Sequence, residues 1–306
     1  MSSAEFSHIP VMLFECIDGL CIKPGGIYVD GTLGGCGHSS VILKNGGRVI
    51  GIDRDETAIK NANEKYPEII TVHDNYSNII NVLNNLDIKQ IDGALLDLGV
   101  SSYQLDTPER GFSYRFDAPL DMRMDTSKGI TAYDVVNGYS QAQLEKIFFS
   151  YGEEQYSRAI AASIVKRREV SPVATTMQLS DIICASVPPK ARRGKHPAKK
   201  VFQAIRIEVN GELSVLEQTM YDFASVLKPG GRLAVITFHS LEDRAVKNAF
   251  ARLTKGCECP PDFPVCVCGK KPQGTLLSRK PILPSDGELL KNPRSASAKL
   301  RIFIKA

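Results

Sequence analysis

Short apolar runs alternate with amphipathic stretches over residues 1–110. The apolar runs predict strands at 27–30, 47–53, 69–73 and 92–98. The stretches between them have apolar residues at helical spacing and predict helices at 38–45, 55–65 and 76–86. Because strands that alternate with helices form parallel sheets with crossover connections, this part of the chain is predicted to be an α/β domain.

The pattern changes between residues 107 and 197, where few strands are predicted. Residues 108–129 are charged and loop-like. A helix is predicted from Ser140, because Gln143 follows three residues later as in a capping box. Further helices are predicted at 157–168 and 178–185. We therefore expect a discontinuous α/β domain, 1–106 and 198–306, interrupted by a mainly helical insertion at 107–197.

The α/β pattern resumes near Lys200. Apolar residues at helical spacing predict one long helical segment over 201–227, which the glycines at 230 and 231 should end. A strand is predicted at 232–238, and Ser240 is predicted to cap the helix that follows. His239, between that strand and that helix, is a candidate for the substrate site. A last strand is expected at 300–304.

A glycine-rich loop follows the first predicted strand. It comprises Gly31, Gly34, Gly35 and Gly37, between Asp30 and the next helix. Glycines let the backbone approach a ligand closely, and the helix offers unpaired N–H groups. Asp53 ends the second strand, where an acid can accept hydrogen bonds from ribose hydroxyls, and Asp97 ends the fourth. These features predict a nucleoside pocket at the carboxyl edge of the sheet.

The carboxylate of Asp30 favours some nucleoside ligands over others. The loop lacks the Gly-x-Gly-x-x-Gly spacing of dinucleotide sites, and a carboxylate beside it would repel a pyrophosphate. No Gly-x4-Gly-Lys-Ser/Thr motif for ATP is present either. An acid favours a ligand with a cationic ammonium, such as S-adenosylmethionine. A nicotinamide-dependent dehydrogenase on a related fold is the less favoured alternative.

The charge of the chain permits a polyanionic partner. Its 306 residues include 38 Lys and Arg against 34 Asp and Glu, which gives a net charge of +4. Residues 190–200 hold six Lys or Arg and no acid, which suits either phosphate contacts or a solvated loop. The N-terminus has no signal pattern, and no run approaches the ~20 apolar residues that span a membrane. We therefore expect a cytoplasmic protein without a membrane partner.

Eight cysteines fall into two groups. Those at 16, 21, 36 and 184 are scattered, which indicates free buried thiols in a reducing compartment. Those at 257, 259, 266 and 268 form two Cys-x-Cys pairs that could make a tetrahedral zinc site. Because zinc sites usually have Cys-x2-Cys spacing, free or oxidation-prone thiols are favoured and no metal ligand is assigned.

Ordered motifs throughout the chain match one family. They are His8-Ile-Pro-Val-Met-Leu13, Asp30-Gly-Thr-Leu-Gly-Gly-Cys-Gly-His-Ser39, Gly51-Ile-Asp-Arg-Asp55, Leu95-Leu-Asp-Leu-Gly-Val-Ser-Ser102, Arg110-Gly-Phe-Ser113, Leu120-Asp-Met-Arg-Met-Asp125, Tyr151-Gly-Glu-Glu154, His196-Pro197, Phe202-Gln-Ala-Ile-Arg206, Asn210, Glu212-Leu213 and Phe238-His-Ser-Leu-Glu-Asp-Arg244. Over nearly its whole length the chain closely resembles the bacterial small-subunit ribosomal RNA cytosine-N4 methyltransferases, the MraW-like family.

The resemblance implies a Rossmann-like methyltransferase domain interrupted by a helical substrate domain. It implies S-adenosylmethionine as donor, and N4 of a cytidine in the decoding region of 16S rRNA as target, in the small ribosomal subunit. By motif position, the cofactor contacts would be Cys36, Gly37, His38, Asp53, Tyr76, Asp97 and Gln104. Cys36 replaces the Gly or Ala more usual in the family, so any oxidation sensitivity there would be new.

The catalytic group stays unassigned at this point. The lone pair of cytosine N4 is delocalised into the ring, so an acceptor for the N4–H would help; Ser101, Ser102 and Asp97 are candidates by position only. Methylation at C5 would need a cysteine nucleophile, and the one Cys-Pro pair, Cys259-Pro260, lies in the irregular tail. N4 is therefore favoured over C5. A non-catalytic RNA-binding or ribosome-assembly protein is the alternative function, and the sequence leaves room for a homodimer.

Overall fold

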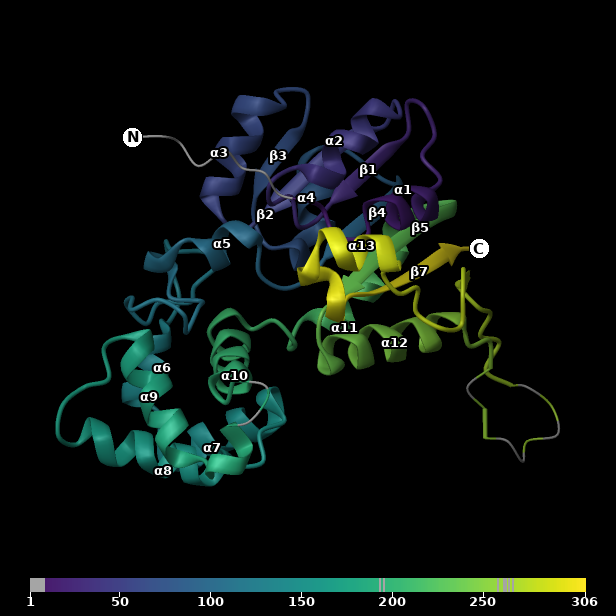
Figure 1. Cartoon of the computed structure of the whole chain (residues 1–306). Coiled ribbons are helices and arrows are strands. Elements are labelled where there is room, and N and C mark those ends of the chain that lie inside the picture. The colour runs from purple at the N-terminus through teal and green to yellow at the C-terminus, as the bar shows by residue number, and fades with distance from the viewer. Residues whose placement is uncertain are drawn as a thin grey trace. The chain divides into compact units, whose positions relative to one another are not determined.

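The computed structural model describes residues 9–192, 194, 196–257, 259–260, 263, 265 and 267–306 (Figure 1). The chain divides into two compact units, Met1–Gly99 with Leu213–Ala306, and Val100–Glu212. The helical unit is thus longer at both ends than the predicted insertion at 107–197. Its C-terminal extension is helix α10 (Ala198–Asn210), which buries Val201 and Ile205 in the core of the helical unit.

The α/β unit is built on a seven-stranded sheet in the order β3-β2-β1-β4-β5-β7-β6. Its strands are β1 (Ile27–Asp30), β2 (Arg48–Asp53), β3 (Ile70–His73), β4 (Ile91–Asp97), β5 (Leu227–Thr237), β6 (Gly274–Leu276) and β7 (Lys299–Lys305). Strands β1 to β5 are parallel, whereas β7 pairs antiparallel with β5 and β6. The four strands predicted in the first part of the chain are confirmed, and the expected last strand is β7.

Alternating residues of the strands face two separate cores. Val29 and Leu96 belong to one core, and their neighbours Tyr28 and Leu95 to the other. The helices are α1 (Leu13–Leu20), α2 (Gly37–Lys44), α3 (Glu56–Lys65), η1 (Tyr76–Asn78), α4 (Ile79–Asn85), α11 (Leu216–Val226), α12 (Ser240–Thr254), α13 (Asp286–Lys291) and η4 (Pro293–Ser297). Helices α4, α11 and α12 cover the first core, and α1, α2 and α3 cover the second (Figure 1).

The long helix predicted over 201–227 is wrong. Two helices, α10 and α11, occupy this stretch, and they fall in different units. Gly211 ends α10 in the left-handed conformation, with φ 61°. Because glycine has no Cβ, it adopts this conformation at little cost and lets the chain turn away. The apolar spacing continues across the break, which is why periodicity alone did not show it.

Strand β5 begins earlier than the predicted strand at 232–238. It starts at Leu227 and includes the Pro-Gly-Gly sequence at 229–231. Its pairing with β4 shifts register between Ile91 and Gly93, so the extra residues are accommodated as an irregularity rather than as a separate turn.

The cap predicted for the next helix is also corrected. Helix α12 begins at Ser240, and its N-cap is His239. The ring Nδ1 of His239 accepts a hydrogen bond from the amide of Glu242 at 3.4 Å, and the Glu242 carboxylate accepts one from the amide of Phe238 at 2.8 Å. His239 is thereby accounted for as a helix cap.

The second unit is helical. It contains α5 (Ser102–Asp106), η2 (Pro108–Arg110), α6 (Ala132–Gly138), α7 (Gln141–Gly152), α8 (Ser157–Arg168), α9 (Thr176–Ser186), η3 (Pro189–Arg192) and α10. The predicted Ser140–Gln143 capping box is confirmed, and so is the helix at 157–168. Phe148 and Ile160 are fully buried in its core. In the part of the chain that the structure describes, no helix is long and apolar enough to cross a membrane.

Candidate functional site

Four acids follow four neighbouring parallel strands at one edge of the sheet. Asp30, Asp53 and Asp97 are the last residues of β1, β2 and β4, and Asp74 comes directly after β3. The amide of Asp74 donates to the carbonyl of Asp53 at 3.0 Å, which holds the two strand ends together. Asp74 was not among the predicted site residues, although it stands at the carboxyl end of its strand as the other three acids do. This edge therefore concentrates negative charge where ligands bind in open α/β sheets.

Asp30 shapes the glycine loop from inside. Its Oδ1 accepts a hydrogen bond from the amide of Thr32 at 3.2 Å, and its Oδ2 accepts one from the hydroxyl of Ser39 at 2.7 Å. The residue is buried, and this burial raises its pKa, although both hydrogen bonds act in the opposite direction. Because each oxygen already has a partner within the loop, Asp30 holds the turn into α2.

Two further hydrogen bonds fix the glycine loop to the neighbouring strands. The amide of Gly34, which has φ +47°, donates to Oδ2 of Asp53 at 2.8 Å. The amide of Asp97 donates to the hydroxyl of Thr32 at 2.6 Å. These hydrogen bonds connect the glycine loop to the ends of β2 and β4. They hold the loop next to the predicted site residues Asp53 and Asp97.

Asp53 remains partly exposed beside the loop. Its second oxygen accepts a hydrogen bond from the amide of Asp55 at 2.8 Å. Burial raises its pKa to about 6, with a smaller contribution from the charges of Asp55 and Asp30. A carboxylate has about four acceptor positions, so two amide donors leave room for ligand hydroxyls.

Asp97 has an unsatisfied oxygen. Its Oδ1 is buried and has no hydrogen-bond partner among the described residues. Burial raises the pKa of this carboxyl to about 8, and the charges of Asp30 and Glu242 add to the effect. An unpaired buried carboxylate is costly, and a cationic ligand at this oxygen would remove the cost.

Cys36 and Gly37 lie where the loop enters α2. Cys36 is the N-cap, with φ 63°, and its side chain is fully buried. Burial raises the pKa of its thiol to about 12, so the reactive thiolate is suppressed and oxidation sensitivity is not expected. A Cβ on Gly37 would lie 2.3 Å from Cγ of Pro10, so this position requires glycine for packing.

The ring of His38 is turned away from the loop. Its Nε2–H donates to the carbonyl of Val11 at 3.0 Å, and burial lowers its pKa to about 4, which keeps the ring neutral. The amide of Met12 in turn donates to the Glu288 carboxylate at 3.3 Å. Residues of the 8–13 motif therefore contact the start of α2 and help to hold the glycine loop. The sequence did not suggest this role. His8 itself lies outside the described residues.

Tyr76, the predicted adenine contact, lies close to the glycine loop. It begins η1 and is partly buried against the core. A Cβ on Gly31 would lie 3.0 Å from the Cβ of Tyr76, so the absence of a side chain at Gly31 permits this close approach. The start of η1 and the glycine loop thus lie together in the α/β unit.

Gln104 belongs to the helical unit, with Ser101 and Ser102. Oε1 of Gln104 accepts a hydrogen bond from the amide of Ser101 at 3.1 Å, and Oγ of Ser101 accepts one from the amide of Gln104 at 3.2 Å. These groups form the capping box of α5, and Ser102 is its first helical residue. Gln104 and Ser101 thus have structural roles in their own unit.

The basic run at 190–200 has an aromatic neighbour in the helical unit. The rings of Tyr114 and His196 are stacked, with centroids 4.5 Å apart and an angle of 12° between their planes. Lys200 donates to the carbonyl of Glu153 at 2.7 Å. Arg193 and Lys195 lie outside the described residues. From the sequence, Phe202 was the one aromatic residue expected near this run. Tyr114 is distant along the chain, so only the fold shows that it stacks on His196.

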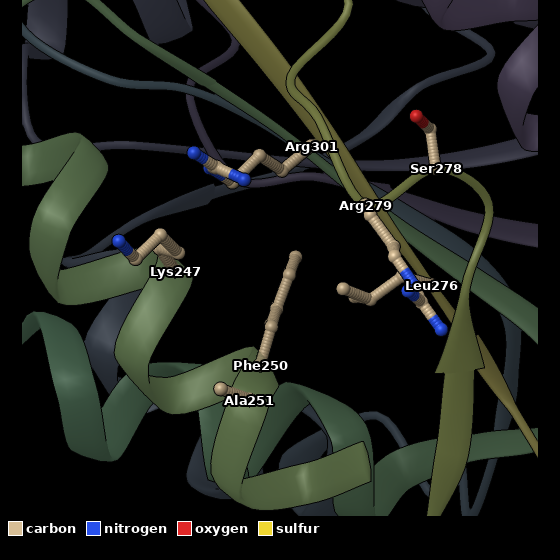
Figure 2. A pocket seen from close by; sticks show the side chains of 7 residues that line it. All are labelled: Lys247, Phe250, Ala251, Leu276, Ser278, Arg279 and Arg301. Atoms are coloured by element: carbon tan, nitrogen blue, oxygen red, sulfur yellow. The ribbon is translucent and has the colours of Figure 1, made fainter.

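A pocket of about 200 Å³ lies elsewhere in the α/β unit, between α12 and the β6–β7 edge (Figure 2). Phe250 and Leu276 provide apolar surface, and Lys247, Arg279 and Arg301 bring cationic groups. None of the residues that line this pocket is a predicted site residue. Strand β5 lies between the strands of the pocket and β4, which ends in Asp97.

Comparison with known proteins gives consistent matches. A model of the MraW methylase family matches residues 5–306. Ribosomal RNA small subunit methyltransferase H of Carboxydothermus hydrogenoformans is 55% identical over 302 residues, which cover 97% of each chain. The protein of the same name from Clostridium botulinum strain Loch Maree is 54% identical over 307 residues, covering 98% of this chain and 99% of the relative.

Proposed function

We propose, since the chain belongs to the MraW methylase family and is an S-adenosylmethionine-dependent methyltransferase, that it methylates N4 of a cytidine in the decoding region of 16S rRNA. We place this activity on the small ribosomal subunit in the cytoplasm. The single observation that supports the site most strongly is the acidic edge of the sheet, where Asp97 has a buried oxygen without a partner among the described residues.

The residues at this edge suit S-adenosylmethionine. The donor has a sulfonium and an ammonium group, and Asp97 offers an unpaired carboxylate oxygen to a cation. Asp53 is assigned to the ribose hydroxyls, because it is partly exposed and keeps acceptor capacity. Tyr76 is assigned to the adenine, and the backbone of Cys36, Gly37 and His38 to the rest of the donor. Gln104 is the candidate contact from the helical unit.

When bound, S-adenosylmethionine supplies an electrophilic methyl group. The protein must align this group with the attacking nitrogen and exclude water, which accounts for much of the rate enhancement in such reactions. The hydrogen bonds from Gly34 to Asp53 and from Asp97 to Thr32 preorganise the edge for this alignment. We keep Asp97 as a candidate acceptor for the N4–H, because its Oδ1 has no hydrogen-bond partner among the described residues.

The chemistry of the buried thiols supports N4 over C5 as the target. Methylation at C5 requires a thiolate nucleophile. Burial raises the pKa of Cys36 to about 12, and it also raises the pKa of Cys16. Both side chains are buried, so neither offers a reactive thiolate.

The helical unit is proposed to contact the rRNA. Its basic run can neutralise phosphates, and the Tyr114–His196 stack offers an aromatic face to an unstacked base. Such stacking is a common mode of recognition for single-stranded RNA.

The proposal is tested with purified protein, labelled S-adenosylmethionine and small subunits from cells that lack the enzyme, followed by mass spectrometry of the digested nucleosides. We expect labelled N4-methylcytidine, and less of it with an Asp53→Ala variant at the same donor concentration. Donor binding without any transfer would favour an assembly role instead, and a methyl group on another atom would exclude the assigned target.

A further inference from the structure

We propose that the two Cys-x-Cys pairs between α12 and β6 bind one Zn²⁺ ion in a four-thiolate structural site. The ligands are Cys257, Cys259, Cys266 and Cys268. This site is separate from the acidic edge of the sheet and does not depend on the proposed methyl transfer.

The geometry of the described thiols fits a tetrahedral zinc site. The Sγ atoms of Cys257, Cys259 and Cys268 all lie within 4.8 Å of one another, and those of Cys257 and Cys268 are 3.8 Å apart. In a tetrahedral site with Zn–S bonds of about 2.3 Å, neighbouring sulfurs are about 3.8 Å apart. The fold thus brings the first pair, Cys257 and Cys259, together with Cys268 across the intervening loop sequence.

The fourth ligand is assigned from the sequence. Cys266 lies outside the described residues, two positions before Cys268. The first pair, Cys257 and Cys259, has the same spacing, and both members of that pair lie in the cluster. Four thiolates complete a closed coordination shell, which is typical of structural zinc sites rather than catalytic ones.

Backbone amides donate to two of the sulfurs. The amide of Cys259 donates to Sγ of Cys257 at 3.3 Å, and the amide of Val267 donates to Sγ of Cys259 at 3.4 Å. Such donors stabilise negative charge on sulfur and favour the thiolate that zinc requires. The Cys-x-Cys spacing is shorter than that of most zinc sites. It nevertheless allows backbone amides to donate to the sulfurs of Cys257 and Cys259.

The apolar side chains of this segment that the structure describes bury little surface. Its apolar side chains Phe263, Val265 and Val267 are 49%, 70% and 73% exposed. A loop that buries so little needs another source of order, and a metal can supply it, as in small metal-dependent domains. Basic residues at 255, 270 and 271 flank the cysteines and can offset the net negative charge of a zinc–tetrathiolate centre.

The test uses the full-length protein purified under reducing conditions. We expect elemental analysis to find about one zinc ion per chain, as a closed four-thiolate site would hold. The double variant Cys257→Ser/Cys268→Ser should lose this zinc. Cys21→Ser, which removes an exposed thiol outside the cluster, should retain it.

A second readout identifies the ligands. Replacement of zinc by Co²⁺ should give the intense thiolate-to-metal absorption of a tetrahedral sulfur site, and this should be absent from the double variant. Zinc-free protein that shows no Co²⁺ spectrum, or a Cys257–Cys268 disulfide in protein purified without oxygen, would overturn the proposal. Donor affinity, measured by calorimetry on the same samples, reports separately on the methyltransferase site.

Discussion

The amide of Gly34 donates a hydrogen bond to Oδ2 of Asp53 at 2.8 Å. This bond joins two sequence motifs, the glycine loop and the acid that ends β2, into one site. Asp53 therefore has two tasks: it holds the loop in place, and it keeps acceptor capacity for a ligand. A change at this residue should affect both.

Replacing Asp53 with alanine should weaken binding of S-adenosylmethionine by ~1.5–3 kcal/mol, the cost of lost hydrogen bonds to a charged acceptor. Isothermal titration calorimetry measures this change. Glu64→Ala, which removes one exposed acid from α3, is the control and should leave the affinity unaltered. Equal affinities for the Asp53→Ala variant and the parent would refute the ribose assignment.

Donor affinity should also depend on pH through Asp53. Its pKa of about 6 means that the carboxylate is mostly ionised at pH 7 and becomes protonated as the pH falls below 6. A protonated carboxyl loses acceptor capacity, so affinity should fall by a factor of ~10 between pH 7 and pH 5 if binding requires the ionised form. In Asp53→Asn this contribution should be absent, which leaves the titration of Asp97, with its pKa of about 8, as the remaining source of pH dependence. An unchanged pH profile in Asp53→Asn would assign the titration near pH 6 to another group.

Asp97 should reduce stability when it is ionised. The folded state raises its pKa from 3.8 to about 8, so the unfavourable contribution begins above pH 4, grows up to pH 8 and is constant beyond that. Relative to the parent, Asp97→Asn should therefore be stabilised more at pH 9 than at pH 5, in urea unfolding. The same variant should bind S-adenosylmethionine more weakly. A stability difference that is the same at both pH values would contradict the burial of this charge.

Gly37→Ala should destabilise the protein by ~1–3 kcal/mol, because the new methyl group would overlap Pro10. The double variant Gly37→Ala/Pro10→Ala lacks the Pro10 ring atoms that the new methyl group would overlap. It should therefore recover part of the lost stability. Gly287→Ala adds a Cβ whose nearest contact is 4.0 Å away, and alanine is favoured over glycine in a helix such as α13, so thermal unfolding of that variant should show no destabilisation. An undisturbed Gly37→Ala protein would show that the 9–12 segment does not pack on the loop.

Tyr114→Ala should weaken binding of small-subunit rRNA by ~1–3 kcal/mol, the contribution of one stacked base. Donor affinity should stay the same, because Tyr114 stacks on His196 and is not one of the proposed donor contacts. Tyr133→Ala removes an exposed tyrosine elsewhere in the helical unit and serves as the control. Filter binding at one fixed salt concentration measures the rRNA affinity of both variants. An equal loss of affinity in the two would show that the Tyr114–His196 stack makes no specific contribution.

The sequence predicted the α/β unit well, because strands buried on both faces leave continuous apolar runs and their terminal acids are visible as breaks. It did not predict the supporting contacts. The hydrogen bond from His38 to Val11 and the packing of Pro10 on Gly37 join residues that no periodic pattern relates. The break at Gly211 was missed for a different reason, since the apolar spacing continues through it.

Candidate residues near the unit boundary show a further limit. Gln104 and Ser101 were chosen by motif position, yet their polar groups cap α5. A short helix start and a ligand contact use the same residue types, so sequence alone does not separate them. The thiol cluster shows the reverse: the Cys-x-Cys spacing argued against a metal, whereas the folded loop brings Cys257 and Cys268 together.

The most direct test of the account is to establish which atom receives the methyl group. Small subunits from cells that lack the enzyme, grown on heavy nitrogen, are incubated with the protein and with S-adenosylmethionine that has a heavy-carbon methyl group. NMR of the purified nucleoside should show one-bond coupling between the methyl carbon and a cytosine N4. A methyl carbon without nitrogen coupling, as on C5 or on a ribose oxygen, would contradict the account.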